Sequence, residues 1–144
     1  MYLPTILKVV IAALVATSLM TLFSYAYSAV RKQQFRETEL LNHLLARLHW
    51  IDPSAGVHHW AGWCIHYLIG LFFVAIYYWT GIVHDFSDYV IAGALAGMVG
   101  VAGWKVIFAL HPSPPSIPFK EYYLQLIAAH MVFGIGAYLG ITAI

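Results

Sequence analysis

Residues 89–110 read YVIAGALAGMVGVAGWKVIFAL, an apolar run in which Lys105 is the single charged side chain. A helix needs about 20 mostly apolar residues to cross a bilayer. Three more apolar stretches of this kind occupy residues 9–30, 60–81 and 119–144. Because lipid cannot pair with backbone polar groups, each stretch must pair its own, and we predict four transmembrane helices.

The composition of the chain also favours a membrane protein. Its 144 residues are 62% hydrophobic and 9% charged, whereas a soluble domain is about 45–50% apolar and about 25% charged. We therefore predict an all-α, four-helix membrane bundle that forms one domain, residues 1–144. The net charge of +1 gives no reason to expect nucleic acid as a partner, and the lipid bilayer is the expected surrounding.

The first apolar stretch has an alternative interpretation as a signal peptide, because Ala26 and Ser28 resemble a small-residue cleavage site. Its apolar run is longer than the roughly 7–15 residues of a signal-peptide core. We therefore expect it to remain as the first span.

Basic residues are distributed unevenly between the predicted loops. All except Lys8 lie between the first and second spans or near the connection between the third and fourth: Arg31, Lys32, Arg36, Arg47, Lys105 and Lys120. By the positive-inside rule, both of these longer loops face the cytoplasm and both termini face outward. The predicted location is the inner (plasma) membrane.

The loop between the first two spans carries apolar residues at helical spacing, with charged residues between them. The apolar set is Phe35, Leu40, Leu41, Leu44, Leu45 and Leu48, and the charged set is Arg36, Glu37, Glu39 and Arg47. This pattern predicts an amphipathic cytoplasmic helix. The helix either lies on the inner leaflet or packs against the cytoplasmic end of the bundle, and the sequence leaves both positions open.

Two histidines lie deep within predicted spans, where polar side chains are costly and are natural candidates for function. His66 and His130 both fall in the inner half of their spans, and each begins an HxxxG pattern that ends at Gly70 or Gly134. We expect both imidazoles to point into the bundle, because lipid would leave a ring N–H unpaired. They either make structural hydrogen bonds or bind protons or a small ligand.

Two further residues share helix faces with these histidines. His59 lies two helical turns before His66, and Tyr123 lies two turns before His130, so both join the ligand- or proton-binding candidates. No cofactor is expected, although haem b held by two imidazoles is one conceivable ligand. We predict no catalytic or metal site, because no nucleophile–base–acid set and no third convergent metal ligand is recognisable.

Small residues mark the predicted helix contacts. Glycines that let neighbouring helices approach closely are Gly70, Gly93, Gly97, Gly100, Gly134, Gly136 and Gly140. The first span carries a stripe of small and hydroxyl-bearing residues: Ala13, Thr17, Thr21, Ser24 and Ser28. Such faces pack within the bundle or against another subunit, so we expect a homo-oligomer or an assembly with other membrane subunits.

Two other positions carry simple structural expectations. In the short turn before the third span, Asp85 or Ser87 is predicted to cap the helix rather than to bind a metal ion. Cys64, the single cysteine, is expected to be a buried small apolar residue.

Three stretches resemble the YagU-like family of uncharacterised inner-membrane proteins. They are Asp52-Pro53 followed by Ala61-Gly62 and the HxxxG at His66, then residues 92–96 (AGALA), then Pro114–Pro118 with Glu121 and the helix that contains His130. The resemblance covers about residues 50–135. It implies a four-span inner-membrane protein and supplies no established activity.

The sequence thus supports two functional hypotheses. The first is a non-enzymatic scaffold or subunit of a membrane assembly, which packs through its glycine-rich faces. The second is a binding or transport module in which His66 and His130 hold a proton, a small ligand or haem b.

Overall fold

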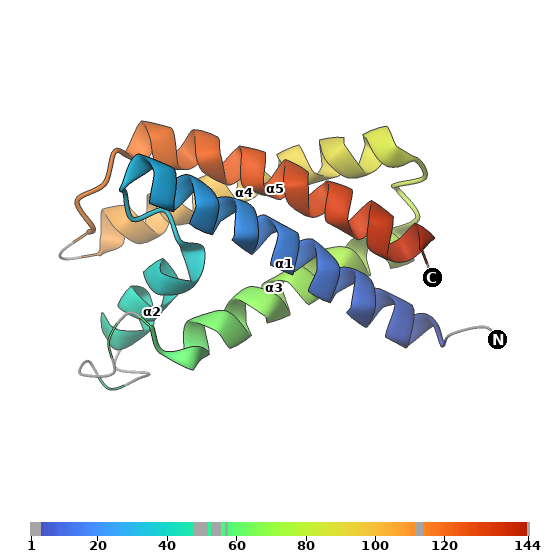
Figure 1. Cartoon of the computed structure of the whole chain (residues 1–144), viewed down its shortest axis with the longest axis horizontal. Coiled ribbons are helices and arrows are strands. Elements are labelled where there is room, and N and C mark those ends of the chain that lie inside the picture. Colours follow the sequence, from blue (N-terminus) through green and yellow to red (C-terminus); the bar gives the residue numbers. More distant parts are fainter. Residues whose placement is uncertain (1–3, 48–51, 53–55, 57, 112–113, 144) are drawn as a thin grey trace.

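The computed structural model of the chain describes residues 4–47, 52, 56, 58–111 and 114–143. Within them it contains helices and no strand: α1 (Thr5–Arg31), α2 (Glu37–Arg47), α3 (Trp60–Thr80), α4 (Phe86–Leu110) and α5 (Phe119–Thr142). Figure 1 shows the four long helices running along the molecule, with α2 at one end and both termini at the other. The predicted all-α, four-helix architecture is confirmed.

The four long helices are each long and apolar enough to cross a membrane, with mean hydropathies between 1.6 and 2.3. Their outer faces carry large apolar side chains, such as Leu22 and Phe72, which are 66% and 61% exposed. Water would disfavour such a surface, and a bilayer accommodates it. Cys64 is also exposed, so the expectation that it is buried is wrong; α3 buries little of its surface inside the bundle.

Helix α4 begins earlier than the predicted third span, because an aspartate caps it. The Asp85 side chain accepts a hydrogen bond from the backbone N–H of Asp88 at 3.0 Å. This arrangement satisfies a donor that the first turn of a helix leaves unpaired. The predicted capping role of Asp85 is confirmed.

Helix α5 is the centre of the bundle, because α1 and α4 both pack along it. A Cβ atom added to Gly97 on α4 would lie 2.8 Å from Ile127 Cα, and one added to Gly136 on α5 would lie 2.7 Å from Ala16 Cα. Only glycine allows backbones to come so close. All the predicted packing glycines meet another helix of this one chain: Gly70, Gly93, Gly97, Gly134, Gly136 and Gly140 at close range, and Gly100 at ordinary van der Waals distance.

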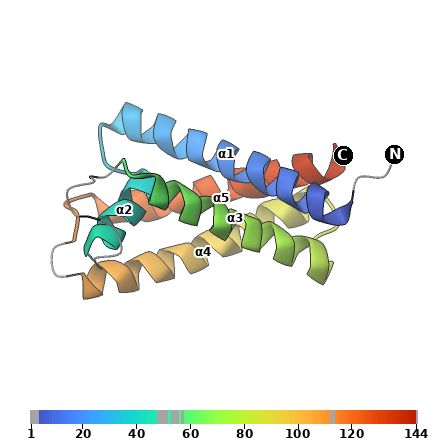
Figure 2. The ribbon, with the colours of Figure 1, turned by 90° about the horizontal axis from the view of Figure 1, so that it is seen from below.

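Helix α2 packs against α3 at the end of the bundle (Figure 2), as the second of its two expected positions requires. The cytoplasmic location of that end stays a prediction. Two of the charged residues in the amphipathic pattern, Glu37 and Glu39, are only 3% and 4% exposed. Their burial is tolerated because Ser24 and Arg36 donate hydrogen bonds to them. Leu48 lies outside the described residues.

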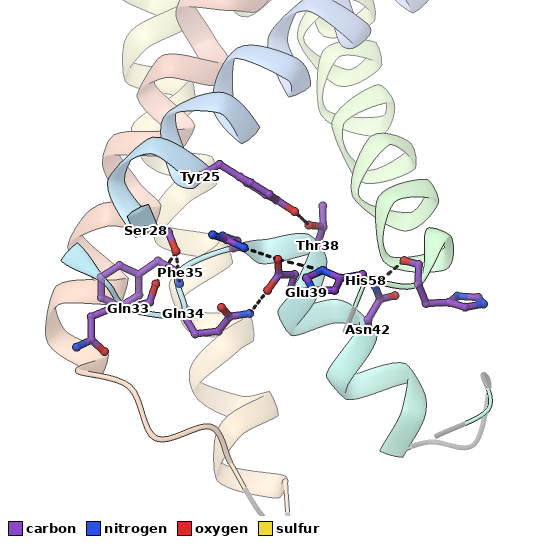
Figure 3. A network of polar contacts seen from close by, with 11 residues as sticks. Tyr25, Ser28, Gln33, Gln34, Phe35, Thr38, Glu39, Asn42 and His58 are labelled. Carbon is purple, nitrogen blue, oxygen red and sulfur yellow. Dashed lines mark hydrogen bonds and ion pairs between the residues drawn. The ribbon is translucent and has the colours of Figure 1, made fainter. Parts of the chain in front are cut away.

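Hydrogen bonds fix α2 between α1 and α3, as Figure 3 shows. The hydroxyls of Tyr25 and Thr38 lie 2.8 Å apart and join α1 to α2. The Asn42 side chain donates to the His59 carbonyl at 2.5 Å and accepts from the Gly62 N–H at 2.7 Å. The start of α3 is therefore held by α2. Figure 3 also shows Gln34 and His58, which both contact Glu39.

Candidate functional site

A cavity of about 210 Å³ lies within the bundle on the side where α3 and α4 face each other. Helix α4 packs on α5, and α3 packs on α1 and α2, whereas in the described residues α3 and α4 do not pack along each other. Figures 1 and 2 show that these two helices converge at the connection between them and separate toward α2. The separation leaves room for the cavity.

All five helices contribute to the lining of the cavity, which is mostly apolar. Its apolar wall includes Met20, Phe73, Trp104, Ile107, Leu126 and Phe133. Two other lining residues, Ile69 on α3 and Gly103 on α4, are exposed. The cavity therefore reaches the outer surface of the bundle between α3 and α4, on a side that a bilayer would cover.

His66 lies in this lining and is 6% exposed. Its Nε2 atom lies 3.0 Å from the hydroxyl of Thr21 on α1, and that hydroxyl donates a hydrogen bond to the Thr17 carbonyl at 2.6 Å. The imidazole thus points into the bundle, as predicted. Its partner belongs to the hydroxyl-bearing stripe of the first span, and the buried positions of that stripe are Ala13, Thr17, Thr21, Ser24 and Ser28.

His130 lines the same cavity from α5. Its Nδ1 atom lies 2.8 Å from the Leu126 carbonyl one turn earlier on the same helix. A Cβ atom added to Gly100 would make ordinary van der Waals contact with the ring, 3.4 Å from Cε1 and 3.6 Å from Nε2. The Nε2 edge of the ring therefore faces α4, and this imidazole also points into the bundle.

The third polar group of the cavity is the carboxyl of Glu37 on α2. Its Oε1 atom accepts hydrogen bonds from Ser24 on α1, at 2.9 Å, and from Gln125 on α5, at 3.4 Å. Its Oε2 atom is buried without a partner in the described part of the chain. Burial raises the pKa of Glu37 from 4.5 to about 7, and the bonds from Ser24 and Gln125 oppose that rise.

Hydroxyl groups on successive turns of α1 contact the polar groups of the cavity. Ser24 donates a hydrogen bond to Glu37, and Thr21 is hydrogen-bonded to His66. Ser24 and Thr21 are three residues apart, which corresponds to about 4.5 Å along the helix. One further turn along, the Thr17 hydroxyl is buried without a hydrogen-bond partner in the described residues, and Thr17 also lines the cavity. The cavity thus has an apolar wall and a row of polar groups.

Two of the predicted candidates lie elsewhere. The His59 side chain accepts a hydrogen bond from the Ala61 N–H at 3.1 Å and caps α3. The Tyr123 ring stacks on Phe119 and lies 5.4 Å from the Lys105 ammonium. Neither residue is part of the cavity lining. The HxxxG glycines also differ in their neighbours, because Gly70 meets α1 and Gly134 meets α4.

The observed hydrogen bonds bear on the haem hypothesis. A bis-imidazole iron needs one free nitrogen from each ring, and Nε2 of His66 is engaged by Thr21. Coordination through that atom would require His66 to leave Thr21. In the part of the chain that the structure describes, no group of three or more His, Cys, Asp and Glu side chains could hold a metal ion.

No family model, curated protein or solved structure matches the chain. The resemblance to the YagU-like family therefore depends on the residues quoted above, and we retain it as a proposal. The site must be interpreted from its own chemistry.

Proposed function

We propose that this chain is a multi-pass inner-membrane protein that binds a small, mostly apolar molecule in the cavity between α3 and α4. The observation that carries the proposal is that two residues of the lining, Glu37 and Thr17, each hold a buried polar atom, Oε2 and Oγ1, that has no partner in the described residues. Such an atom costs about 1–3 kcal/mol. A ligand with one polar group would remove part of that cost.

The size and the opening of the cavity indicate what kind of molecule fits. A cavity of about 150 Å³ accommodates benzene, so about 210 Å³ accommodates one substituted ring or a head group of similar volume. The opening near Ile69 and Gly103 would let a longer tail remain in the bilayer. A mostly apolar lining with a few polar groups is typical of ligand sites.

The competing scaffold hypothesis depended on glycine faces that were free to bind partners. Gly93 and Gly97 pack on α5, and Gly136 and Gly140 pack on α1. Because these contacts form within one chain, they no longer support an assembly. Self-association stays a prediction, and the mass of the detergent-solubilised particle would measure it.

The orientation in the membrane is part of the proposal. All basic residues except Lys8 lie toward the end of the bundle that carries α2. By the positive-inside rule, this distribution favours a cytoplasmic location for that end. A Pro114→Cys variant in a Cys64→Ser background should resist an impermeant maleimide in intact cells. A Ser87→Cys variant is the matched control and should react quickly, and the reverse pattern would contradict this orientation.

Ligand binding can be tested with Trp104, which lies in the cavity wall. In a variant that keeps Trp104 and has phenylalanine at the other four tryptophans, 4-bromobenzyl alcohol should quench the fluorescence in a saturable way. The matched reporter keeps only Trp79, which is 64% exposed, and should show only the linear quenching that partition into detergent produces. Equal quenching of the two reporters would contradict the proposal.

A blocking variant gives a second test. A Cβ atom at Gly103 would meet nothing within 4 Å, so Gly103→Phe should fill the cavity without disturbing the helix packing and should abolish saturable quenching. Ile91→Phe adds bulk to an exposed position of the same helix and should leave the quenching unchanged. Full binding by a folded Gly103→Phe variant would count against a site in this cavity.

A further inference from the structure

The hydrogen bonds of His66 determine where its ring proton lies. The Thr21 hydroxyl has one hydrogen, which it donates to the Thr17 carbonyl because a carbonyl can only accept. Toward His66 the hydroxyl oxygen must therefore accept, and Nε2 of His66 must carry the proton. In a neutral imidazole the remaining nitrogen, Nδ1, is then a lone-pair acceptor. Among the described residues it has no hydrogen-bond partner.

His130 has the opposite tautomer, because of its own hydrogen bond. Its Nδ1 atom contacts the Leu126 carbonyl at 2.8 Å, so Nδ1 carries the proton and Nε2 of the neutral ring is an acceptor. This Nε2 atom is the one that faces α4 near Gly100. In the described part of the chain no donor reaches it.

These assignments make the polar groups of the cavity complementary to one kind of ligand. His66, His130 and Glu37 line the cavity together. Each neutral imidazole has one acceptor nitrogen, and the Oε2 atom of Glu37 is buried without a partner in the described residues. Of the described residues that line the cavity, none is a lysine or an arginine. The geometry points to a ligand whose head group donates hydrogen bonds, with an ammonium group as the best match, held by His66 Nδ1, His130 Nε2 and Glu37.

This inference rests on the proposed function, because it specifies the chemistry of the molecule that the cavity binds. An ammonium group offers three N–H donors and no acceptor, and its positive charge is complementary to the Glu37 carboxylate. A neutral hydroxyl offers one donor and should bind more weakly. A carboxylate head offers only acceptors, and the side chains of the lining that have a donor for it are Thr17 and Trp104. It has no cation to pair with in the described lining and would lie near the Glu37 carboxylate, so it should bind more weakly than the amine.

Three probes of matched size test the order of affinities: 4-bromobenzylamine, 4-bromobenzyl alcohol and 4-bromophenylacetate. Each is titrated at pH 8 against the variant whose only tryptophan is Trp104. The quenching of the Trp79 reporter is subtracted, because it measures partition of the probe into detergent. We expect the amine to bind at least about tenfold more tightly than phenylacetate, because hydrogen bonds to charged groups are the stronger ones. The alcohol should lie between them.

Single substitutions assign the head-group contacts. His130→Leu keeps an apolar side chain and removes the acceptor, and it should weaken amine binding about tenfold; Glu37→Gln should bring amine and alcohol to similar affinities. His84→Leu changes a histidine in the exposed outer turn and is the matched control, which should bind like the starting protein. Circular dichroism confirms that each variant folds.

The possible results separate the two proposals. If none of the probes quenches Trp104 in a saturable way, the proposed binding function fails. If phenylacetate binds as tightly as the amine, the cavity binds small molecules but the donor-bearing head group is wrong. The order of affinities is measured without any substitution at His130 or Glu37, so a variant that fails to fold leaves the test intact.

Discussion

Replacing Glu37 with glutamine should make the protein more stable than the unaltered chain at pH 8. The substitution keeps an acceptor oxygen for Ser24 and Gln125, which both contact Oε1 of Glu37. It replaces the unpartnered Oε2 with a neutral amide nitrogen, close to a Gln125 whose own Oε1 is buried without a partner in the described residues. The shape of the side chain stays nearly the same, so the change isolates the charge.

The magnitude follows from the pKa of Glu37, which burial raises from 4.5 to about 7. Between these two values the folded state binds the proton and the unfolded state has lost it, so the free energy of unfolding falls as the pH rises. Above about pH 7 the full penalty remains. At about 1.36 kcal/mol for each pH unit, the penalty is about 3 kcal/mol, and the glutamine variant should escape it.

Thermal unfolding in detergent, followed by circular dichroism from pH 4 to pH 8.5, measures this effect. The difference in stability between the two proteins removes contributions that they share, such as those of His66 and His130. We expect similar stabilities near pH 4 and a growing advantage for glutamine up to about pH 7.5. A difference that does not change with pH, or a variant that is less stable at pH 8, would refute the reasoning.

Two further predictions concern the packing and the tautomer of His66. Gly97→Ala should lower stability by about 1–3 kcal/mol, since its Cβ would lie 2.8 Å from Ile127 Cα. Gly103→Ala has nothing within 4 Å of its Cβ and should be neutral or slightly stabilising. Melting temperatures in detergent compare the two variants, and equal losses of stability would contradict this packing. Thr21→Val should lower the free energy of unfolding by about 1–3 kcal/mol, because the Nε2–H of His66 loses its acceptor. Thr21→Ser keeps the hydroxyl and should keep the stability. A valine variant as stable as the serine variant would contradict the tautomer assigned to His66.

The four long helices were predictable because each contains a long apolar run, which is recognisable in the local sequence alone. The short turn that contains Asp85 and the amphipathic pattern of α2 were recognisable for the same reason. The inward orientation of His66 and His130 was also predictable, since lipid leaves a ring N–H without a partner. These conclusions require no knowledge of which helices are neighbours.

The cavity could not be predicted, because it depends on which helices pair and which do not. Glu37 lies in a charged stretch that suggests an outward-facing residue, and its burial follows from Ser24 and from the distant Gln125. Gln125 was the missed signal: an amide within the first two turns of an apolar span requires a polar partner. His59 and Tyr123 share the helix faces of the two histidines, but they lie too near the helix ends to reach the cavity.

A crystal structure of the protein grown with 4-bromobenzylamine tests the central claim most directly, because anomalous diffraction locates the bromine atom. We expect a bromine peak in the cavity between α3 and α4, beside Trp104, with the amine toward His66, His130 and Glu37. Bromine found only at the outer surface of the helices, with the cavity filled by protein side chains, would contradict it.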